Sequence, residues 1–500
     1  MVNQASHTPV LFRRIALVAF VMTATVVGVL SSTIQSASAQ NNTVPAQTYY
    51  PVINLLHQGE FRSAKAIVDG FQGRLVYQGD VQVRFLDAVC YRTMYGESCY
   101  RLGEYDLALE QFESALSLYV SIQGFFQQRT NFPREILDDQ EATRNAQVPW
   151  ATSTRTPRYG AYGSMNVRLG KTPQENEFAA RNGGVIDPEV LLPVNITEVM
   201  RCVSLAMYRR QMIKGPIATI DPLTRQLSTN LIGTGGATVR GSWSGIAKGL
   251  SYMSQGDLQR AVPLLSGSLQ IGGKDHPLTA TALLALGKIA INQNRLSDAS
   301  TLFLEASIAA AAYDQYDLVE EALRYGAIIH ASGRTLKPYE PLVAAIAWAR
   351  NRDTLKASLL TTAAMLAAES ADADAAAKLL GDARREMSGN DISRSNIQTR
   401  WQYVNAMVSH LKQDQKRGDE NFQRYLAAAG NTSLWLYQIA LADNAIRANV
   451  MSERQSENLY DMLLREPTDF DWKFRPEETM AFLMTPHLSL IHISEPTRPY

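Results

Sequence analysis

The stretch VCYRTMYGESCYRLGEYDLALEQFESALSL, residues 89–118, contains the pattern from which the architecture of the chain can be worked out. Gly96 lies inside a helical pattern, where it costs about 1 kcal/mol relative to Ala, so a second helix is expected to pack closely against it. Gly103 is placed to take the left-handed conformation that ends a helix. Ala108, Phe112 and Ala115 follow on one face of the next helix. The stretch therefore predicts a helical hairpin.

The same layout recurs along the chain. Copies with a small residue in the first helix, a turn residue and a small or apolar second-helix face occupy residues 245–269, 283–308 and 359–384, and an incomplete copy occupies residues 55–71. In these copies Asp257 is expected to cap its helix, and Asn294 to take the left-handed turn conformation. Self-similarity of this kind predicts stacked hairpins with a continuous core.

These residues resemble the tetratricopeptide repeat, and GESCYRLGEYDLALEQFESAL (residues 96–116) is the most specific match. Equivalent alanines are 44 residues apart between Ala64 and Ala108 and 38 between Ala261 and Ala299, against about 34 in the family, so helices or loops are expected to be longer. The resemblance implies an all-α fold, a superhelical solenoid of helical hairpins with one long irregular insertion. The whole pattern also resembles tetratricopeptide repeat proteins secreted by planctomycete-type bacteria.

Such an array acts through its concave face, which in the family is lined by the first helix of each hairpin. The resemblance therefore implies a groove for a protein or peptide partner, whose identity the sequence does not give. For Trp243, and for Leu250 beside it, a position in the core is an equally good interpretation. The residues assigned to this groove are Glu97, Tyr100, Arg101, Trp243, Met253, Lys288 and Asn292.

The N-terminus has the features of an export signal. Arg13 and Arg14 precede an apolar run over residues 15–30, and small residues at Ala37 and Ala39 follow. This pattern predicts cleavage between Ala39 and Gln40, and an exported protein in the periplasm or outside a bacterial cell, with no stable membrane insertion afterwards. An uncleaved signal that anchors the chain in the membrane is the alternative.

The remaining organisation follows from composition and spacing. A polar segment over 123–193 interrupts the repeats and is expected to be a partly disordered insertion. The predicted units are the signal peptide (1–39), N-terminal repeats (40–122), the insertion (123–193), a helical pair with a Gly-rich connector (194–238), a repeat array (239–470), the start of a further helical unit (471–487) and a tail (488–500).

Composition and motifs argue against several chemistries. Lys plus Arg and Asp plus Glu are equal at 48 each, which gives no reason to expect a nucleic-acid partner. Scattered histidines predict no metal site, and the Gly-rich 233–241 segment lacks a dinucleotide fingerprint, so no cofactor and no catalytic residues are expected. Glu320 and Glu321 are interpreted as solvated. Cys90 and Cys99 are too far apart along one helix to bridge, although either could meet Cys202.

The tail LSLIHISEPTRPY, residues 488–500, resembles translated sequencing-adaptor DNA. The natural protein is therefore expected to continue past His487. Two hypotheses for function follow. The first is an exported, non-catalytic scaffold that binds partners through its concave face. The second is the regulatory or recognition arm of a larger enzyme, for example a caspase-like peptidase, whose catalytic domain would lie beyond residue 487.

Overall fold

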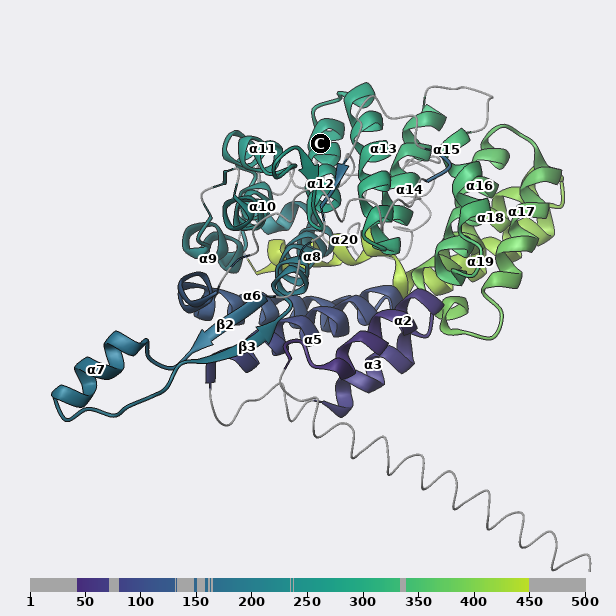
Figure 1. Ribbon diagram of the computed structural model, residues 1–500. Coiled ribbons are helices and arrows are strands. Elements are labelled where there is room, and N and C mark those ends of the chain that lie inside the picture. Colours follow the sequence, from purple (N-terminus) through teal and green to yellow (C-terminus); the bar gives the residue numbers. More distant parts are fainter. Residues whose placement is uncertain are drawn as a thin grey trace, which may run out of the picture.

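The structure is a computed structural model, and it describes residues 43–448 except for 72–80, 131, 133–147, 151–157, 161, 163–164, 234, 237 and 333–338. The described chain is mainly helical, and its helices follow one another as packed pairs (Figure 1). The prediction of an all-α solenoid is confirmed. The predicted signal segment with Ala39 and Gln40, and the C-terminal segments 471–487 and 488–500, lie outside the described residues.

In the residues that the structure describes, the array consists of six helical hairpins, and in each the two helices pack along each other. Between the second and third of them come α8 (Ile196–Lys214), the short helix η3 (Gly215–Thr219) and α9 (Pro222–Asn230), and α14 (Tyr316–Ser332) and α15 (Glu340–Trp348) form a looser pair. The six hairpins are α2 (Tyr50–Gln58) with α3 (Phe61–Gly70), α5 (Val81–Leu102) with α6 (Tyr105–Arg129), α10 (Val239–Ser254) with α11 (Leu258–Gly267), α12 (Thr279–Asn292) with α13 (Leu296–Ala312), α16 (Asp353–Glu369) with α17 (Ala373–Glu386), and α18 (Asn396–Leu411) with α19 (Gln415–Thr432).

The small residues inside the first helices explain how closely the hairpins pack. A Cβ added to Gly96 would lie 2.7 Å from the Phe112 ring, and one added to Gly287 would lie 2.6 Å from the Phe303 ring. No other residue leaves room for these rings, which fill the space between the helices of each hairpin. The predicted close contact at Gly96 is confirmed.

The hairpin turns have the backbone conformations and the helix cap that the sequence predicts. Gly103 and Asn294 both have positive φ angles, of 79° and 56°. The Asp257 side chain accepts a hydrogen bond from the backbone N–H of Arg260, so it caps α11 as predicted.

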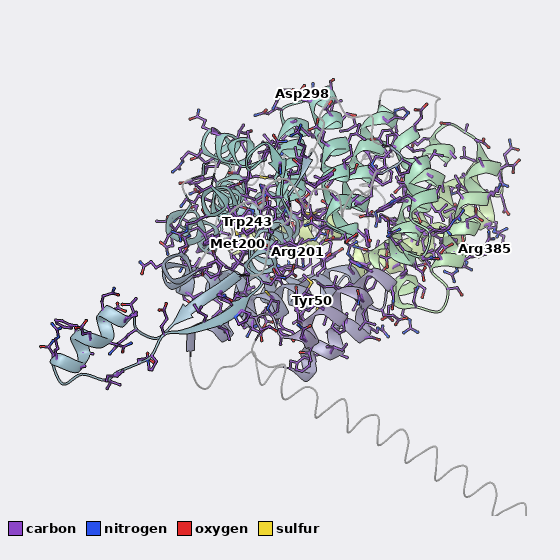
Figure 2. All side chains as sticks on the ribbon, viewed as in Figure 1. Tyr50, Met200, Arg201, Trp243, Asp298 and Arg385 are labelled. Atoms are coloured by element: carbon purple, nitrogen blue, oxygen red, sulfur yellow. The ribbon has the colours of Figure 1, made fainter. Side chains whose placement is uncertain are left out.

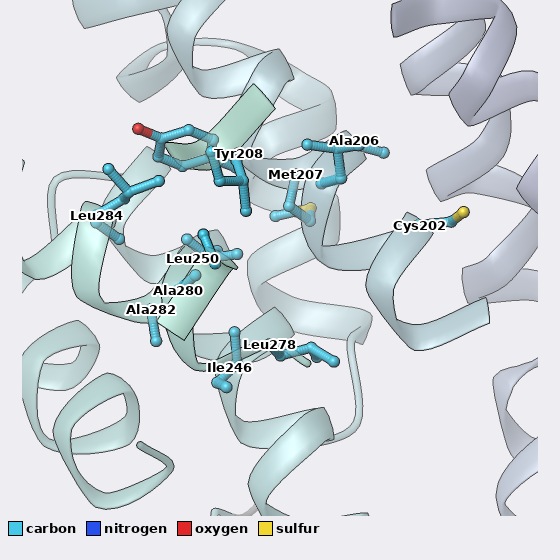
Figure 3. Close-up of a cluster of buried hydrophobic side chains, with 14 of the residues drawn as sticks. Cys202, Ala206, Met207, Tyr208, Ile246, Leu250, Leu278, Ala280, Ala282 and Leu284 are labelled. Carbon is cyan, nitrogen blue, oxygen red and sulfur yellow. The ribbon is translucent and has the colours of Figure 1, made fainter. Parts of the chain in front are cut away.

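The core is continuous along the array, and α8 lies at its centre. This helix packs against α5, α6, α10 and α12, and most of its side chains are buried. Figure 3 shows part of the cluster, where Tyr208 and Met207 of α8 meet Leu250 of α10 and Leu284 of α12. All three cysteines are buried free thiols, Cys202 among them.

The array curls until its last helices, which end with α20 (Leu434–Arg447), contact its first. α16 packs on α2, α18 on α5, and α20 on α8. The backbone N–H of Arg62 donates to Asp391 at 2.8 Å, and the Tyr105 hydroxyl donates to the carbonyl of Thr432 at 2.7 Å. We call this contact between the two ends of the array the closing seam.

Part of the segment predicted as irregular is regular, which corrects that expectation. β2 (Met165–Leu169) pairs antiparallel with β3 (Val190–Val194), and α7 (Pro173–Arg181) lies between them in an arm that projects from the helices (Figure 1). Thr172 and Glu175 form a capping box at the start of α7. The sequence signal was therefore present, as Thr-Pro-x-Glu, but it was outweighed by the polar composition around it. β1 (Arg158–Tyr159) pairs with β4 (Lys274–Asp275).

Within the residues that the structure describes, none of the helices is both long enough and apolar enough to cross a membrane.

Candidate functional site

The residues predicted to line a concave groove are mostly buried, which corrects their assignment to an open surface. Trp243 is 0% exposed and Lys288 is 1% exposed, so for Trp243 the core alternative holds. Of the whole set only Asn292 is exposed. The reason is that faces of first helices that would be open in an extended array meet other helices here, above all α8, which packs against α5, α10 and α12. The buried members of the set are Glu97, Tyr100, Arg101, Trp243, Met253 and Lys288.

Several of these residues take part in a buried ionic cluster where α5, α8 and α14 meet. Arg209 of α8 donates to Glu97 at 2.8 Å and to Glu321 at 2.7 Å, and it is 1% exposed. Arg101 donates to the other oxygen of Glu97 at 2.9 Å. Burial opposes the charged form of Glu97, but the charges and hydrogen bonds of Arg209 and Arg101 outweigh it, so the pKa of Glu97 is lowered.

Glu320 belongs to a second part of the same cluster. It accepts hydrogen bonds from Arg324 at 3.0 Å, Arg400 at 2.9 Å and Ser358 at 2.6 Å. Burial again works against its charge, but Arg324 and then Arg400 lower the pKa of Glu320 strongly. The interpretation of Glu320 and Glu321 as solvated is therefore wrong. Being adjacent on a helix, they point in different directions and each reaches its own cations.

Beside this cluster lies a cavity between α2, α8 and α14, which we call the α2–α8–α14 cavity. Its outer part has a volume of about 610 Å³. A narrower inner part, of about 50 Å³, reaches Glu97 and Arg101. Ile53, His57 and Arg201 line both parts, so the two parts are adjacent. The volume lies in the range of ligand sites in proteins.

Tyrosine side chains form much of the wall of the outer part. Tyr159 and Tyr313 are 6.0 Å apart between ring centroids, edge to face. The Tyr313 hydroxyl donates to the carbonyls of Gly160 and Asp275, at 3.0 and 2.6 Å, and this fixes its ring. Tyr50 and Tyr162 line the same wall. Fixed aromatic rings of this kind offer a large apolar contact area at low entropic cost.

Arg201 is one of three arginines of the described chain that line the cavity, with Arg101 and Arg352 in its inner part. It donates from Nε and Nη2 to the two oxygens of Glu198, at 2.7 Å each. Glu198 also accepts a hydrogen bond from the hydroxyl of the buried Tyr49. Figure 2 shows Arg201 and Tyr50 near each other at the centre of the molecule. The bidentate pair holds the guanidinium in place beside the cavity.

His57 and Tyr316 lie where the outer part narrows to the inner part. Their ring centroids are 4.7 Å apart. The guanidinium of Arg352 stacks over the Tyr316 ring, 4.6 Å from its centroid. Burial lowers the pKa of His57, although Asp317 works in the opposite direction. The imidazole is therefore neutral at neutral pH, so it offers one donor and one acceptor to a ligand.

The lining of the cavity offers several kinds of contact to a ligand. It combines fixed rings with amides and hydroxyls at its mouth, where Asn54 and Asn195 are exposed. The Asn54 amide can pair with a peptide backbone, whereas the Asn195 amide caps α8 and donates to the Tyr50 hydroxyl at 3.0 Å. Among the described residues no group of three His, Cys, Asp or Glu side chains is placed to hold a metal ion.

Sequence reasoning missed most of these cavity residues. A signal existed in the segment WATSTRTPRYGAYGSMNVRLGKT, residues 150–172, where Tyr159 and Tyr162 alternate with Arg and Gly. The partners that complete the wall, such as Tyr313, come from a helix pair more than a hundred residues away along the chain. No local sequence pattern predicts that these residues lie side by side.

In comparisons with known proteins, no family model matches the sequence and no curated protein gives a match.

Proposed function

We propose that this chain is an exported, non-catalytic helical-repeat protein of the tetratricopeptide-like class, and that it binds an extended peptide segment of a protein partner. The observation that carries the proposal is the α2–α8–α14 cavity, with its tyrosine wall and its exposed amides. The proposed binding site is therefore this cavity, and not the groove on the concave face that the sequence predicts.

The lining of the cavity favours a peptide. Tyr50, Tyr159 and Tyr162 provide apolar faces for side chains. Asn54 is exposed and lines the outer part, where its amide can accept from an N–H group and donate to a carbonyl of a peptide. Arg201 on one side and Asp314 and Asp317 on another add charges of both signs, as expected for a site that recognises a mixed sequence.

A selection from random peptides tests the proposal. The purified protein should enrich peptides that share a sequence motif, and a synthetic peptide with that motif should bind in a fluorescence-anisotropy titration. Asn54→Trp places a large ring at the mouth of the cavity without removing a buried group. We expect this variant to bind the peptide at least about tenfold more weakly, a loss of about 1.4 kcal/mol.

Glu110→Trp is the matched control, because Glu110 is exposed on α6 and does not line the cavity. It should bind the peptide as the parent protein does. Failure to enrich any motif would contradict the proposal. An enriched peptide that binds Asn54→Trp and the parent protein equally well would also contradict it, because its site would then lie elsewhere.

A further inference from the structure

A groove separate from the α2–α8–α14 cavity lies between α17 and α19, with α18 beneath it. Its volume is about 870 Å³, and it shares no lining residue with the cavity. We call it the α17–α19 groove. In Figure 1 these three helices form the end of the molecule away from the β2–α7–β3 arm.

The groove is lined by more positive than negative side chains. Four exposed cations face it, Arg384 from α17 and Lys416, Arg417 and Arg424 from α19, against the two carboxylates of Asp414 and Glu420. None of the four cations forms an ion pair with another residue in the described part of the chain. Their charges are therefore available to a ligand.

Cations next to the groove behave differently. Arg385, which is adjacent to Arg384 but does not line the groove, pairs with Asp382. Lys412, at the end of α18, pairs with Asp374 at 2.7 Å. Asp382 and Asp374 thus form ion pairs with cations outside the groove and, among the described residues, neither forms one with the four cations that line it.

The floor of the groove adds an aromatic ring and an amide. The half-buried Trp401 is held by a hydrogen bond from its Nε1 to the carbonyl of Leu380, at 2.9 Å, and the Arg384 guanidinium lies 5.4 Å from its ring. Gln402 also lines the groove, and its Oε1 is buried with no hydrogen-bond partner among the described residues. A buried acceptor in this state gains free energy when a ligand N–H group reaches it.

We propose that the α17–α19 groove binds a short, extended peptide rich in Asp and Glu. Carboxylates of the peptide would pair with Arg384, Arg417 and Arg424, and a backbone N–H would donate to Gln402. An acidic peptide fits better than a nucleic acid or another polyanion, because the carboxylates of Asp414 and Glu420 line the same groove. Nucleic acid carries a negative charge at every phosphate and would bring some of them close to these carboxylates, whereas the carboxylates of a peptide can be separated by neutral residues.

The probe is a short fluorescein-labelled peptide of alternating Glu and Gly, titrated with the full chain by fluorescence anisotropy. Binding should weaken as salt rises, because exposed charges are screened. Arg417→Gln/Arg424→Gln should bind at least about tenfold more weakly, equivalent to about 1.4 kcal/mol. The control Arg225→Gln/Arg350→Gln removes the same charge from exposed positions outside the groove and should bind as the parent protein does.

Trp401→Phe provides a second readout that does not depend on lost affinity. Unlabelled peptide should change the tryptophan fluorescence of the parent protein, and this change should vanish in Trp401→Phe while the peptide still binds. Asn54→Trp should bind the acidic peptide normally, so failure at the α2–α8–α14 cavity and failure at the groove are distinguishable.

Four results would overturn the proposal. They are no binding of the acidic peptide at low salt, an equal loss in the control pair, a fluorescence change that persists without Trp401, and tighter binding of heparin or single-stranded DNA than of the peptide. The last would identify a general polyanion site instead of a peptide groove.

Discussion

Charged side chains in the centre of this molecule pair with one another. Arg209 pairs with three carboxylates, those of Glu97, Glu321 and Asp317, and it also stacks over the Tyr100 ring at 4.8 Å. Removing one partner from such a cluster leaves another buried charge unpaired, which costs about 3–5 kcal/mol. The cluster therefore ties α5, α8 and α14 together in one arrangement, and it tolerates single changes poorly.

The pH dependence of stability should follow from these carboxylates. The pKa values of Glu97, Glu198 and Glu320 lie below the value of 4.5 for an ordinary glutamate. A carboxylate whose pKa is lowered by folding stabilises the protein above pH 4.5, and this contribution is lost as the pH falls toward the folded-state pKa. Urea unfolding at several pH values should show a loss of unfolding free energy below about pH 4.5, of about 1.4 kcal/mol per pH unit for each carboxylate.

Glu320→Gln checks the assignment. This variant has one fewer titrating group, so its stability should be lower at pH 7 but should fall less steeply in acid than that of the parent protein. An identical slope in both proteins would show that Glu320 does not contribute to the acid transition.

At the scale of the element, the hairpins were predictable from the sequence because their determinants are local. Gly96 and Phe112 lie within one hairpin, and so do Gly287 and Phe303. The closing seam was not predictable, because its contacts join distant segments: Arg62 and Asp391 are separated by 329 residues. The candidate cavity depends on that closure and on Tyr159 and Tyr162. The sequence could indicate which kinds of residue form a binding site, but not that these particular residues come together.

Two hairpin turns allow the local and the long-range roles of a glycine to be separated. Gly103 and Gly256 have nearly equal φ angles, of 79° and 80°. A Cβ on Gly103 would lie 2.7 Å from the Cα of Thr432 across the seam, whereas one on Gly256 would meet only Thr219, at an ordinary 3.5 Å. Gly256→Ala should therefore cost only the strain of the left-handed conformation, about 1–2 kcal/mol.

Gly103→Ala should cost that strain and a further ~1–3 kcal/mol, because the backbone at Thr432 has to move. Urea unfolding of the two variants measures the difference. Equal losses of stability would mean that the backbone at Thr432 can move without a loss of free energy. Glycine would then be required at position 103 only by the conformation of the turn.

The whole molecule differs from an open repeat array in having its ends joined. In an open solenoid each repeat contacts only its neighbours, so a local defect spreads only to adjacent repeats. Here a small apolar cluster crosses the seam: Phe61 of α3 and Leu102 of α5 pack with Ile392 of η4 (Asp391–Arg394) and with Ile397 of α18. A defect in this cluster should reach both ends of the chain at once.

Ile392→Ala tests this coupling by hydrogen exchange. Ile392 is fully buried, and its truncation should cost ~2–5 kcal/mol. We expect faster amide exchange in α18 and, because the seam loosens, in α3 and at the end of α5, which are more than 280 residues away in the sequence. Leu265→Ala, in the equally buried core of α11, is the control, and it should raise exchange in α10, α11 and α12 but not in α3. If Ile392→Ala raised exchange only around η4 and α18, the ends would touch without stabilising each other, and the molecule would behave as an open array.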